Sequence, residues 1–237
     1  MKAKNGQNVV GLDIGTTKIS CVVAEVMDDG RIHITGLGET PSRGLRKGVV
    51  VILNATVEAV KNCLQQAELM AGIVIETAVV GIAGGHNRSF NCRVVVAVSG
   101  RDRTVTQEDI DRVMEAARAV NIPNDREILH VLPQEYVLDD QGSISNPLGM
   151  TGSRLEANVH IITAASTSVQ NLVTCVNRAG VEVQDTVLEQ LASSESVLTD
   201  DERELGVALI DIGGGTTDLA IFERGSKWHT SVLPVGG

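Results

Sequence analysis

Residues 208–222 read Ala-Leu-Ile-Asp-Ile-Gly-Gly-Gly-Thr-Thr-Asp-Leu-Ala-Ile-Phe, so two apolar runs flank three glycines and two threonines. Apolar runs of this length are typical of strands and consecutive glycines of tight turns, which predicts a strand, a turn and a returning strand. Glycine lets the backbone bring bare N–H groups against an anion, so the turn is suited to phosphate. Asp211, at the mouth of the turn, is placed to hold Mg²⁺ directly or through water. The candidate phosphate-binding residues are Gly213, Gly214, Gly215, Thr216 and Thr217. Taken alone, the stretch is also compatible with an ordinary glycine-rich hairpin.

A second copy of the pattern lies near the start of the chain, where residues 9–23 read Val-Val-Gly-Leu-Asp-Ile-Gly-Thr-Thr-Lys-Ile-Ser-Cys-Val-Val. Both copies place Asp-Ile-Gly and Thr-Thr inside the same arrangement of strand, turn and strand. Such a repeat indicates two related half-domains that grip one polyphosphate from opposite sides. We therefore expect Asp13 and Asp211 to flank one Mg²⁺. The candidate phosphate-binding residues of this copy are Gly15, Thr16 and Thr17.

The two turns together resemble the phosphate 1 and phosphate 2 loops of the superfamily that contains actin, heat-shock chaperones and sugar kinases. Further segments resemble the FtsA family of bacterial actin-like cell-division proteins, and the likeness covers nearly all 237 residues. These segments are PSRG at 41–44, QAELMA at 66–71, HVLPQEY at 130–136, NPLGM at 146–150 and DERELG at 201–206. The resemblance implies an α/β fold. We expect an actin-like (ribonuclease H-like) ATPase domain with an inserted strand-helix-strand-strand lobe of the 1C (SHS2) type and a truncated second half-domain.

The resemblance also assigns roles to two residues outside the glycine turns. Lys18 matches the basic position near the phosphates in actin-like proteins, which implies a phosphate contact; a solvated charge on a strand is the alternative. Residues 188–194, Leu-Glu-Gln-Leu-Ala-Ser-Ser, resemble the crossing helix of the superfamily. Chaperone relatives position the attacking water with a glutamate at the place of Glu189, although they carry Pro where this chain has Gln190. A plain carboxylate at a helix N-terminus is the alternative for Glu189.

The implied domain organisation divides the chain into four segments. We expect the first part of subdomain 1A at 1–85, the 1C-like lobe at 86–160, the return of subdomain 1A with the crossing helix at 161–203, and the start of subdomain 2A at 204–237. The rest of 2A, subdomain 2B and the adenosine-binding glycines would lie beyond Gly237.

Composition limits the class of protein. The chain has 43% hydrophobic residues and a formal net charge of −10, and it lacks a cluster of basic residues, which argues against nucleic-acid binding. Its four cysteines stand singly, so neither a zinc site nor a disulfide framework is expected. Residues 1–8 are polar and no run of 18 apolar residues exists, so neither a signal peptide nor a membrane span is expected. These features predict a cytoplasmic chain.

Hydrophobic periodicity predicts the elements that position the turns. In the first segment we expect strands at 9–14, 19–26, 32–37 and 77–83, and a helix at 55–71 between Asn54 and Gly72. In the lobe, Thr106 and Asp109 predict a capping box for a helix at 107–120, and strands are expected at 128–132 and 155–163. A helix at 168–179, a short strand at 181–183 and an acidic, solvated turn at 199–204 complete the prediction. The lobe shows no catalytic or metal-binding pattern, which favours a docking or polymer-contact role.

By resemblance, the parent protein binds ATP with Mg²⁺, polymerises, links the FtsZ ring to the membrane and recruits later division proteins. It would be at most a weak ATPase. It would lie on the cytoplasmic face of the cell membrane at the division site, attached only through a C-terminal amphipathic helix absent from this chain. The alternatives are a pilus-assembly actin-like ATPase and a sugar-kinase or chaperone-type nucleotide-binding domain. An amphipathic helix encoded downstream would separate the division protein from the kinase and the chaperone.

Overall fold

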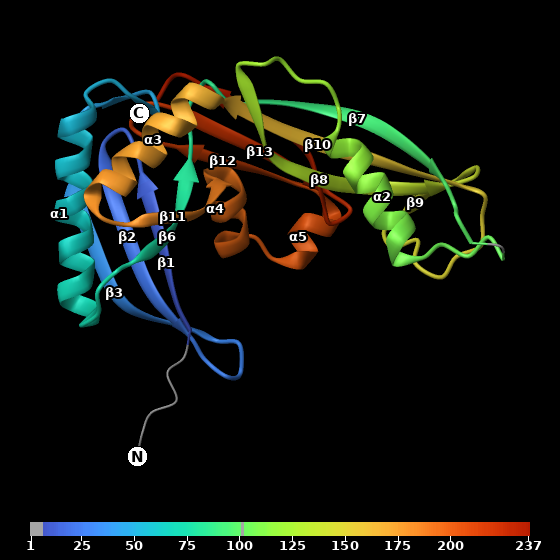
Figure 1. The fold of residues 1–237 in the computed structure, drawn as a ribbon, viewed down its shortest axis with the longest axis horizontal. Helices are drawn as coiled ribbons and strands as arrows, with labels where there is room; N and C mark the ends of the chain where they lie inside the picture. Colours follow the sequence, from blue (N-terminus) through green and yellow to red (C-terminus); the bar gives the residue numbers. More distant parts are fainter. Residues whose placement is uncertain (1–6, 101) are drawn as a thin grey trace.

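The computed structural model describes residues 7–100 and 102–237, so most of the polar stretch 1–8 lies outside the described residues. Over these ranges the chain forms an elongated molecule. A sheet covered by two helices lies at one end and a second sheet with its own helix at the other (Figure 1). A third, smaller sheet runs between them. The α/β class expected from the sequence is confirmed.

The first sheet has the strand order β11-β6-β1-β2-β3. β1, β2 and β3 are antiparallel neighbours, whereas β6 is parallel to β1 and β11 is parallel to β6. The strands are β1 (Gln7–Ile14), β2 (Lys18–Val26), β3 (Ile32–Pro41), β6 (Thr77–Ile82) and β11 (Glu182–Leu188). The first four confirm the predicted strands. β11 is longer than the predicted 181–183 because its pairing with β6 carries it on to Leu188.

Two helices, α1 (Leu53–Ala71) and α3 (Ser166–Ala179), cover one face of this sheet. α1 approaches β3 closely: a Cβ on Gly36 would lie 2.6 Å from the carbonyl oxygen of Ala67. The helix ends at Gly72, as predicted, with φ at 70°. It begins at Leu53 after Ile52, and the predicted N-cap Asn54 is wrong because that residue already lies inside the helix.

A hairpin of two short strands, β4 (Leu45–Arg46) and β5 (Val49–Val50), connects β3 to α1. The N–H of Gly48 in its turn donates to Thr16 Oγ1 at 3.2 Å. The hairpin therefore supports the first glycine turn through this hydrogen bond.

The lobe is an antiparallel sheet in the order β7-β10-β8-β9, against which α2 packs. Its elements are β7 (Arg88–Ala97), α2 (Gln107–Arg118), β8 (Arg126–Leu138), β9 (Gln141–Ile144) and β10 (Arg154–Ala165). The capping box of Thr106 and Asp109 is confirmed. β7 and β9 were not predicted.

Asp109 holds the start of α2 against the lobe. Its side chain is completely buried and accepts hydrogen bonds from Ser99, Thr106 and Arg112. Burial alone would raise the pKa of Asp109, but the bonds from Thr106 and Ser99 outweigh it and hold that pKa well below its usual range. Arg112 also donates to the carbonyl of Ala97 at 2.7 Å. Arg112 is therefore part of the lobe's framework, although its side chain is partly exposed.

The third sheet consists of β12 (Val207–Ile212), β13 (Thr217–Glu223) and β14 (Ser226–Leu233), all antiparallel. The helices α4 (Glu189–Val197) and α5 (Asp200–Leu205) connect the first sheet to it. The solvated turn predicted at 199–204 is wrong. Thr199 and Glu202 form a second capping box, which gives α5 its first hydrogen bonds. Among the described residues, no helix combines the length and the apolarity that crossing a bilayer requires.

His160 joins the lobe to the third sheet. It is 1% exposed, its Nδ1 lies 2.6 Å from Asn91 Oδ1 and its Nε2 lies 2.9 Å from Thr230 Oγ1. Since an amide oxygen only accepts, Nδ1 carries the proton and Nε2 accepts from the threonine hydroxyl. Burial, helped by His229, lowers the pKa of His160 to about 4 from the usual 6.5.

This low pKa predicts that acid weakens the contact that His160 makes between the lobe and the third sheet. As pH falls from 6.5 towards about 4, His160 binds a proton in the unfolded chain but not in the folded chain. Folding stability should therefore decrease over that window and gain nothing from this group above it. Denaturant unfolding at about pH 7 and about pH 5 should show a smaller loss for His160→Gln than for the wild type. The exposed His33→Gln variant should keep the wild-type loss, and an equal loss in all three proteins would contradict the assignment.

Candidate functional site

The two glycine turns lie against each other between the first and third sheets. A Cβ on Gly215 would lie 2.7 Å from Thr16 Oγ1, and a Cβ on Gly214 would overlap the side chain of Thr17. Only glycine permits this approach. A cavity of about 410 Å³ opens beside the contact, lined by both turns together with Asp13, Lys18, Glu189 and Asp211. A second cavity of about 590 Å³ adjoins it and shares those four residues.

Strand alternation places the two aspartates in the cleft. In β1, Leu12 and Ile14 are buried in the core beneath α1 and α3, so Asp13 between them points to the opposite face. In the third sheet, Asp211 pairs directly with Asp218 across β12 and β13. The predicted phosphate and metal residues therefore border one cavity, with the exception of Thr217. Because neighbouring strand residues face opposite sides, Thr217 lies outside the cavity lining, and its hydroxyl donates to the carbonyl of Val235 at 2.8 Å.

Glu189 is brought to the same cavity by the junction of β11 and α4. The helix begins at Glu189, whose side chain lies over Gly81 of β6; a Cβ there would lie 3.0 Å from Glu189 Cγ. A larger residue at position 81 would push the carboxylate away from its place. The glutamate thus reaches the cleft from the first sheet, beside Asp13.

Burial, together with neighbouring negative charges, raises the pKa of three acidic groups in the cleft. The pKa of Glu189 lies well above its usual range, because burial disfavours its charge and Asp13, Asp218 and Asp211 are negative neighbours. Burial also raises the pKa of Asp13, although Glu189 and Lys18 act in the opposite direction. The pKa of Asp218 is raised to about 6, chiefly by burial. The cleft therefore disfavours its own negative charge and gains from a bound cation.

Two orphaned oxygens fit such a cation. Asp13 Oδ1 and Glu189 Oε1 are buried and have no hydrogen-bond partner when both side chains are ionised; a proton shared between the two carboxyls takes the place of a cation otherwise. Within the described residues, however, no three acidic, histidine or cysteine side chains are grouped closely enough to hold a metal by themselves. This donor set suits Mg²⁺, which usually keeps several waters and takes further ligands from phosphate.

Lys18 lies at the rim of the cleft. Its Nζ is 3.3 Å from Glu39 Oε2, and both side chains are more than half exposed. An ion pair in that setting contributes roughly 0–1 kcal/mol, so Lys18 is available to exchange Glu39 for a phosphate.

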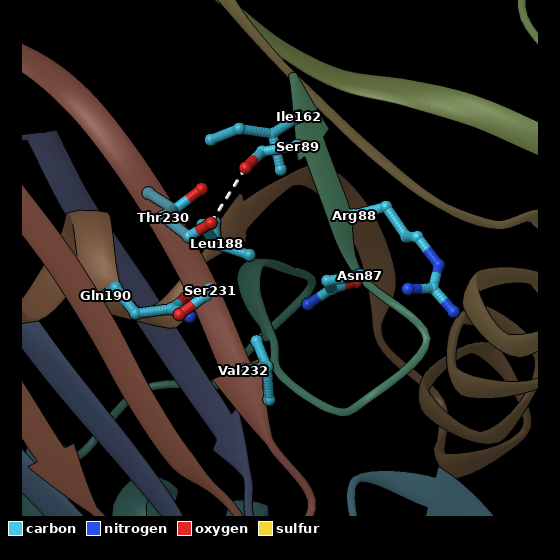
Figure 2. Close-up of a pocket in the computed structure, with 9 residues that line it drawn as sticks. All are labelled: Asn87, Arg88, Ser89, Ile162, Leu188, Gln190, Thr230, Ser231 and Val232. Carbon is cyan, nitrogen blue, oxygen red and sulfur yellow. Dashed lines mark hydrogen bonds between the residues drawn. The ribbon is translucent and has the colours of Figure 1, made fainter.

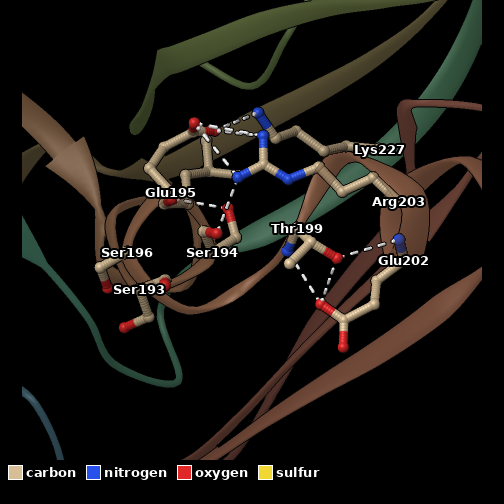
Figure 3. A network of polar contacts seen from close by, with 9 residues as sticks. Ser193, Ser194, Glu195, Ser196, Thr199, Glu202, Arg203 and Lys227 are labelled. Atoms are coloured by element: carbon tan, nitrogen blue, oxygen red, sulfur yellow. Dashed lines mark hydrogen bonds and ion pairs between the residues drawn. The ribbon is translucent and has the colours of Figure 1, made fainter.

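α4 is fixed at both ends on the third sheet. At its start, Gln190 Nε2 donates to Asp218 Oδ1 at 2.7 Å. At its other end, Glu195 pairs with Arg203 at 3.2 Å and with Lys227 at 3.4 Å (Figure 3). Both cations also lie about 6 Å from the ring of Phe222, at 6.0 Å and 5.8 Å from its centroid. Glu189 is therefore held on a helix that spans the cleft.

Sequence reasoning missed several residues of the site. Asp218 closes the Asp-Ile-Gly-Gly-Gly-Thr-Thr-Asp motif, and its place directly across from Asp211 was readable from the hairpin pattern. Ser193 donates to Asp211 Oδ2 at 3.3 Å and lies one helical turn after Glu189, a spacing that offered a second signal. Gln190 and Gly48 carried no such signal, because their contacts are made by distant segments.

Comparisons with known proteins agree with this geometry. Residues 84–163 match the family described as the SHS2 domain inserted in FtsA. The protein named cell division protein FtsA from Pseudomonas aeruginosa is 53% identical over 99% of this chain and 56% of its own length. Its namesake from Escherichia coli K12 is 44% identical over 100% of this chain and 56% of its own length. The chain thus spans about half the length of the curated relatives it matches.

Solved structures share the fold at low identity. The PilM–PilN type IV pilus biogenesis complex matches with a TM-score of 0.69 and 16% identity, over 97% of this chain and 62% of the other. The ethanolamine utilization protein EutJ from Carboxydothermus hydrogenoformans matches with a TM-score of 0.54 and 16% identity, over 98% of this chain and 53% of the other. These likenesses, with the SHS2 match, confirm the actin-like fold expected from the sequence. From its identity to the curated relatives and its inserted lobe, the chain belongs to the FtsA family of cell-division proteins.

Proposed function

We propose that this chain carries the phosphate-binding cleft of an ATP-dependent cell-division protein that polymerises, links the FtsZ ring to the membrane and recruits later division proteins. The observation that carries the proposal is the convergence of both glycine turns, two aspartates and Glu189 on one cavity. Two separate sheets contribute to that cavity, so a ligand held by both turns would fix the sheets relative to each other. Nucleotide binding then becomes a means of setting the shape of the molecule.

The turns would hold the phosphates mainly through the backbone. Gly15, Gly214 and Gly215 present backbone N–H groups without side-chain obstruction, and the hydroxyls of Thr16, Thr17 and Thr216 add donors around the same space. The N–H of Gly213 instead closes the turn on the carbonyl of Thr216 at 2.9 Å. Lys18 would supply a positive charge at the rim. Contacts to the adenine and the ribose would be made by residues outside this chain.

Asp13 and Asp211 would hold Mg²⁺ from opposite sheets, partly through its waters. When bound, the metal supplies positive charge that neutralises the phosphates. The chain's own contribution is to present these carboxylates in a cleft where burial raises the pKa of Asp13 and of the neighbouring Glu189, so that their charged forms gain from a cation. Glu189, held by α4 and Gly81, would orient a water near the terminal phosphate. We propose at most slow hydrolysis.

The lobe would serve as the contact surface. Its helix α2 carries Glu108, Asp111, Glu115 and Arg118 on the exposed side, while Val113 and Ala117 are buried against the sheet. We propose that the chain divides into the four segments expected from its sequence. The lobe, residues 86–160, would contact the next subunit or a division partner. Membrane attachment at the division site would come from a C-terminal helix outside this chain.

The metal assignment predicts a loss of nucleotide affinity when one carboxylate is removed. Asp211→Ala should weaken MgATP binding to the intact protein at least tenfold, or about 1.4 kcal/mol, because the phosphate charge is then poorly neutralised. Titration calorimetry measures this directly. Asp140→Ala removes the same charge from a fully exposed position in the lobe and should bind normally. Equal affinities in both variants would refute the assignment.

The role of Glu189 predicts a separation of turnover from binding. Glu189→Gln should slow phosphate release by at least about tenfold while ATP affinity stays within a few-fold, because a water-orienting contact matters chiefly in the transition state. Glu182→Gln, an exposed position on β11, is the matched control. If Glu189→Gln turns over at the wild-type rate, another residue or none orients the water.

The exposed side of α2 predicts that assembly and stability respond to different arginines. Arg118 is paired only with the exposed Glu115, so Arg118→Glu should impair self-association or partner binding and change the unfolding free energy by less than about 0.5 kcal/mol. Arg112→Glu should instead cost about 1–3 kcal/mol, because it leaves the buried Asp109 without its cation. Sedimentation and thermal unfolding of both variants distinguish the two effects. Wild-type assembly by Arg118→Glu would exclude this face of α2 from the contact.

A further inference from the structure

A small cavity lies where the lobe, α4 and the third sheet meet (Figure 2). The start of β7, the end of β11 with the first turn of α4, and β14 line it. Its volume is about 10 Å³, at the lower bound of the space that a single water requires. Ile162 and Leu188, which belong to an apolar cluster with Leu191, form part of its wall.

Three polar atoms at this junction lack a partner. Gln190 is 1% exposed and its Oε1 accepts no hydrogen bond. Across the cavity, Asn87 Oδ1 and Nδ2 are also buried and unpaired. Buried polar groups in folded proteins are almost always satisfied by protein or by ordered water. A cavity of one water's size, lined by two such side chains, is therefore a water site in both chemistry and volume.

The other end of Gln190 fixes how its amide faces the cavity. Nε2 donates to Asp218 Oδ1 at 2.7 Å, and Asp218 is 5% exposed. A carboxylate offers only acceptors, so the amide nitrogen must face Asp218 and the oxygen must face the cavity. Gln190 is thus a rigid link between β13, which follows the second glycine turn, and the junction with the lobe.

We propose that this cavity holds one ordered water, which donates hydrogen bonds to Gln190 Oε1 and Asn87 Oδ1, and that Gln190 is a positioning residue that couples β13 to the lobe through it. Neighbouring contacts hold the lobe on β14 directly, such as the hydroxyl of Ser89 donating to the carbonyl of Thr230 at 2.7 Å. The water bridge differs from them because it reaches the side chain of Asp218, whereas they reach β13 through the backbone pairing of β14.

The second part of the inference rests on the proposed function. Both turns line the cavity that would hold a polyphosphate, so a ligand that binds to both moves the second turn relative to the first. That movement shifts β13, and with it Asp218. Gln190 keeps both its bonds only if α4 or the start of β7 follows. Nucleotide binding is therefore expected to change the mobility of β7 near Asn87.

The water site is tested first, without nucleotide. A high-resolution crystal structure of the intact protein should show one water within hydrogen-bond distance of Gln190 and Asn87, and the Asn87→Ala structure should lack it or show it displaced. In chemical unfolding, Asn87→Ala and Gln190→Met should be non-additive, with a coupling of at least about fivefold in the unfolding equilibrium constant. Asn91→Ala, four residues after Asn87 and outside the cavity lining, should be additive with Gln190→Met. A dry cavity, or additivity in both pairs, would overturn the proposal. If Gln190→Met does not fold, the two crystal structures decide.

Coupling is tested by amide hydrogen exchange at residues 87–91 with and without MgATP. The wild type should change its exchange there, and Asn87→Ala should lose most of that change while calorimetry shows unaltered MgATP affinity. Unchanged exchange in a wild type that binds MgATP would refute the coupling and leave the proposed function standing. If no MgATP binds, the coupling falls with the proposed function, whereas the water and its bond to Gln190 are judged by the crystal structures.

Discussion

Gly214 and Gly215 lie so close to Thr17 and Thr16 that a side chain on either glycine would collide with a threonine. This contact joins two sheets that otherwise belong to different parts of the chain. The first sheet has its own core beneath α1 and α3, whereas the third sheet packs against the lobe and α4. Where the turns touch, each sheet also presents an aspartate to the same cavity. The closeness of the turns therefore defines both the site and the boundary along which the molecule can open.

Charge explains why a ligand belongs at this boundary. Asp13, Glu189, Asp211 and Asp218 crowd one cleft, and three of them have raised pKa values because burial and mutual repulsion oppose ionisation. An isolated chain tolerates this arrangement only at some cost in folding stability. A cation with a polyphosphate removes the repulsion and supplies partners to oxygens that now have none. The same carboxylates thus lower folding stability when the cleft is empty and favour a polyphosphate that brings a cation when it is filled.

The sequence predicted the turns well because repetition is a strong signal: the same strand, turn and strand pattern occurs twice, and local alternation alone sends Asp13 to the cleft face. β7 was missed because its first six residues, Arg-Ser-Phe-Asn-Cys-Arg, show no regular apolar alternation; one face of the strand is exposed and the other only half-buried. α5 was missed because six residues show no helical periodicity, although Thr199 and Glu202 gave a capping signal. The link from Gln190 to Asp218 lay beyond prediction, since it joins residues 28 positions apart through tertiary packing.

Both turns should grip a single polyphosphate, and amide hydrogen exchange of the intact protein, followed at residues 13–18 and 211–217 with and without MgATP, measures this grip. Backbone N–H groups that bind phosphate exchange more slowly, so a shared grip predicts protection of both turns at the same nucleotide concentration. Protection of one turn alone, or of neither while nucleotide is bound, would contradict it.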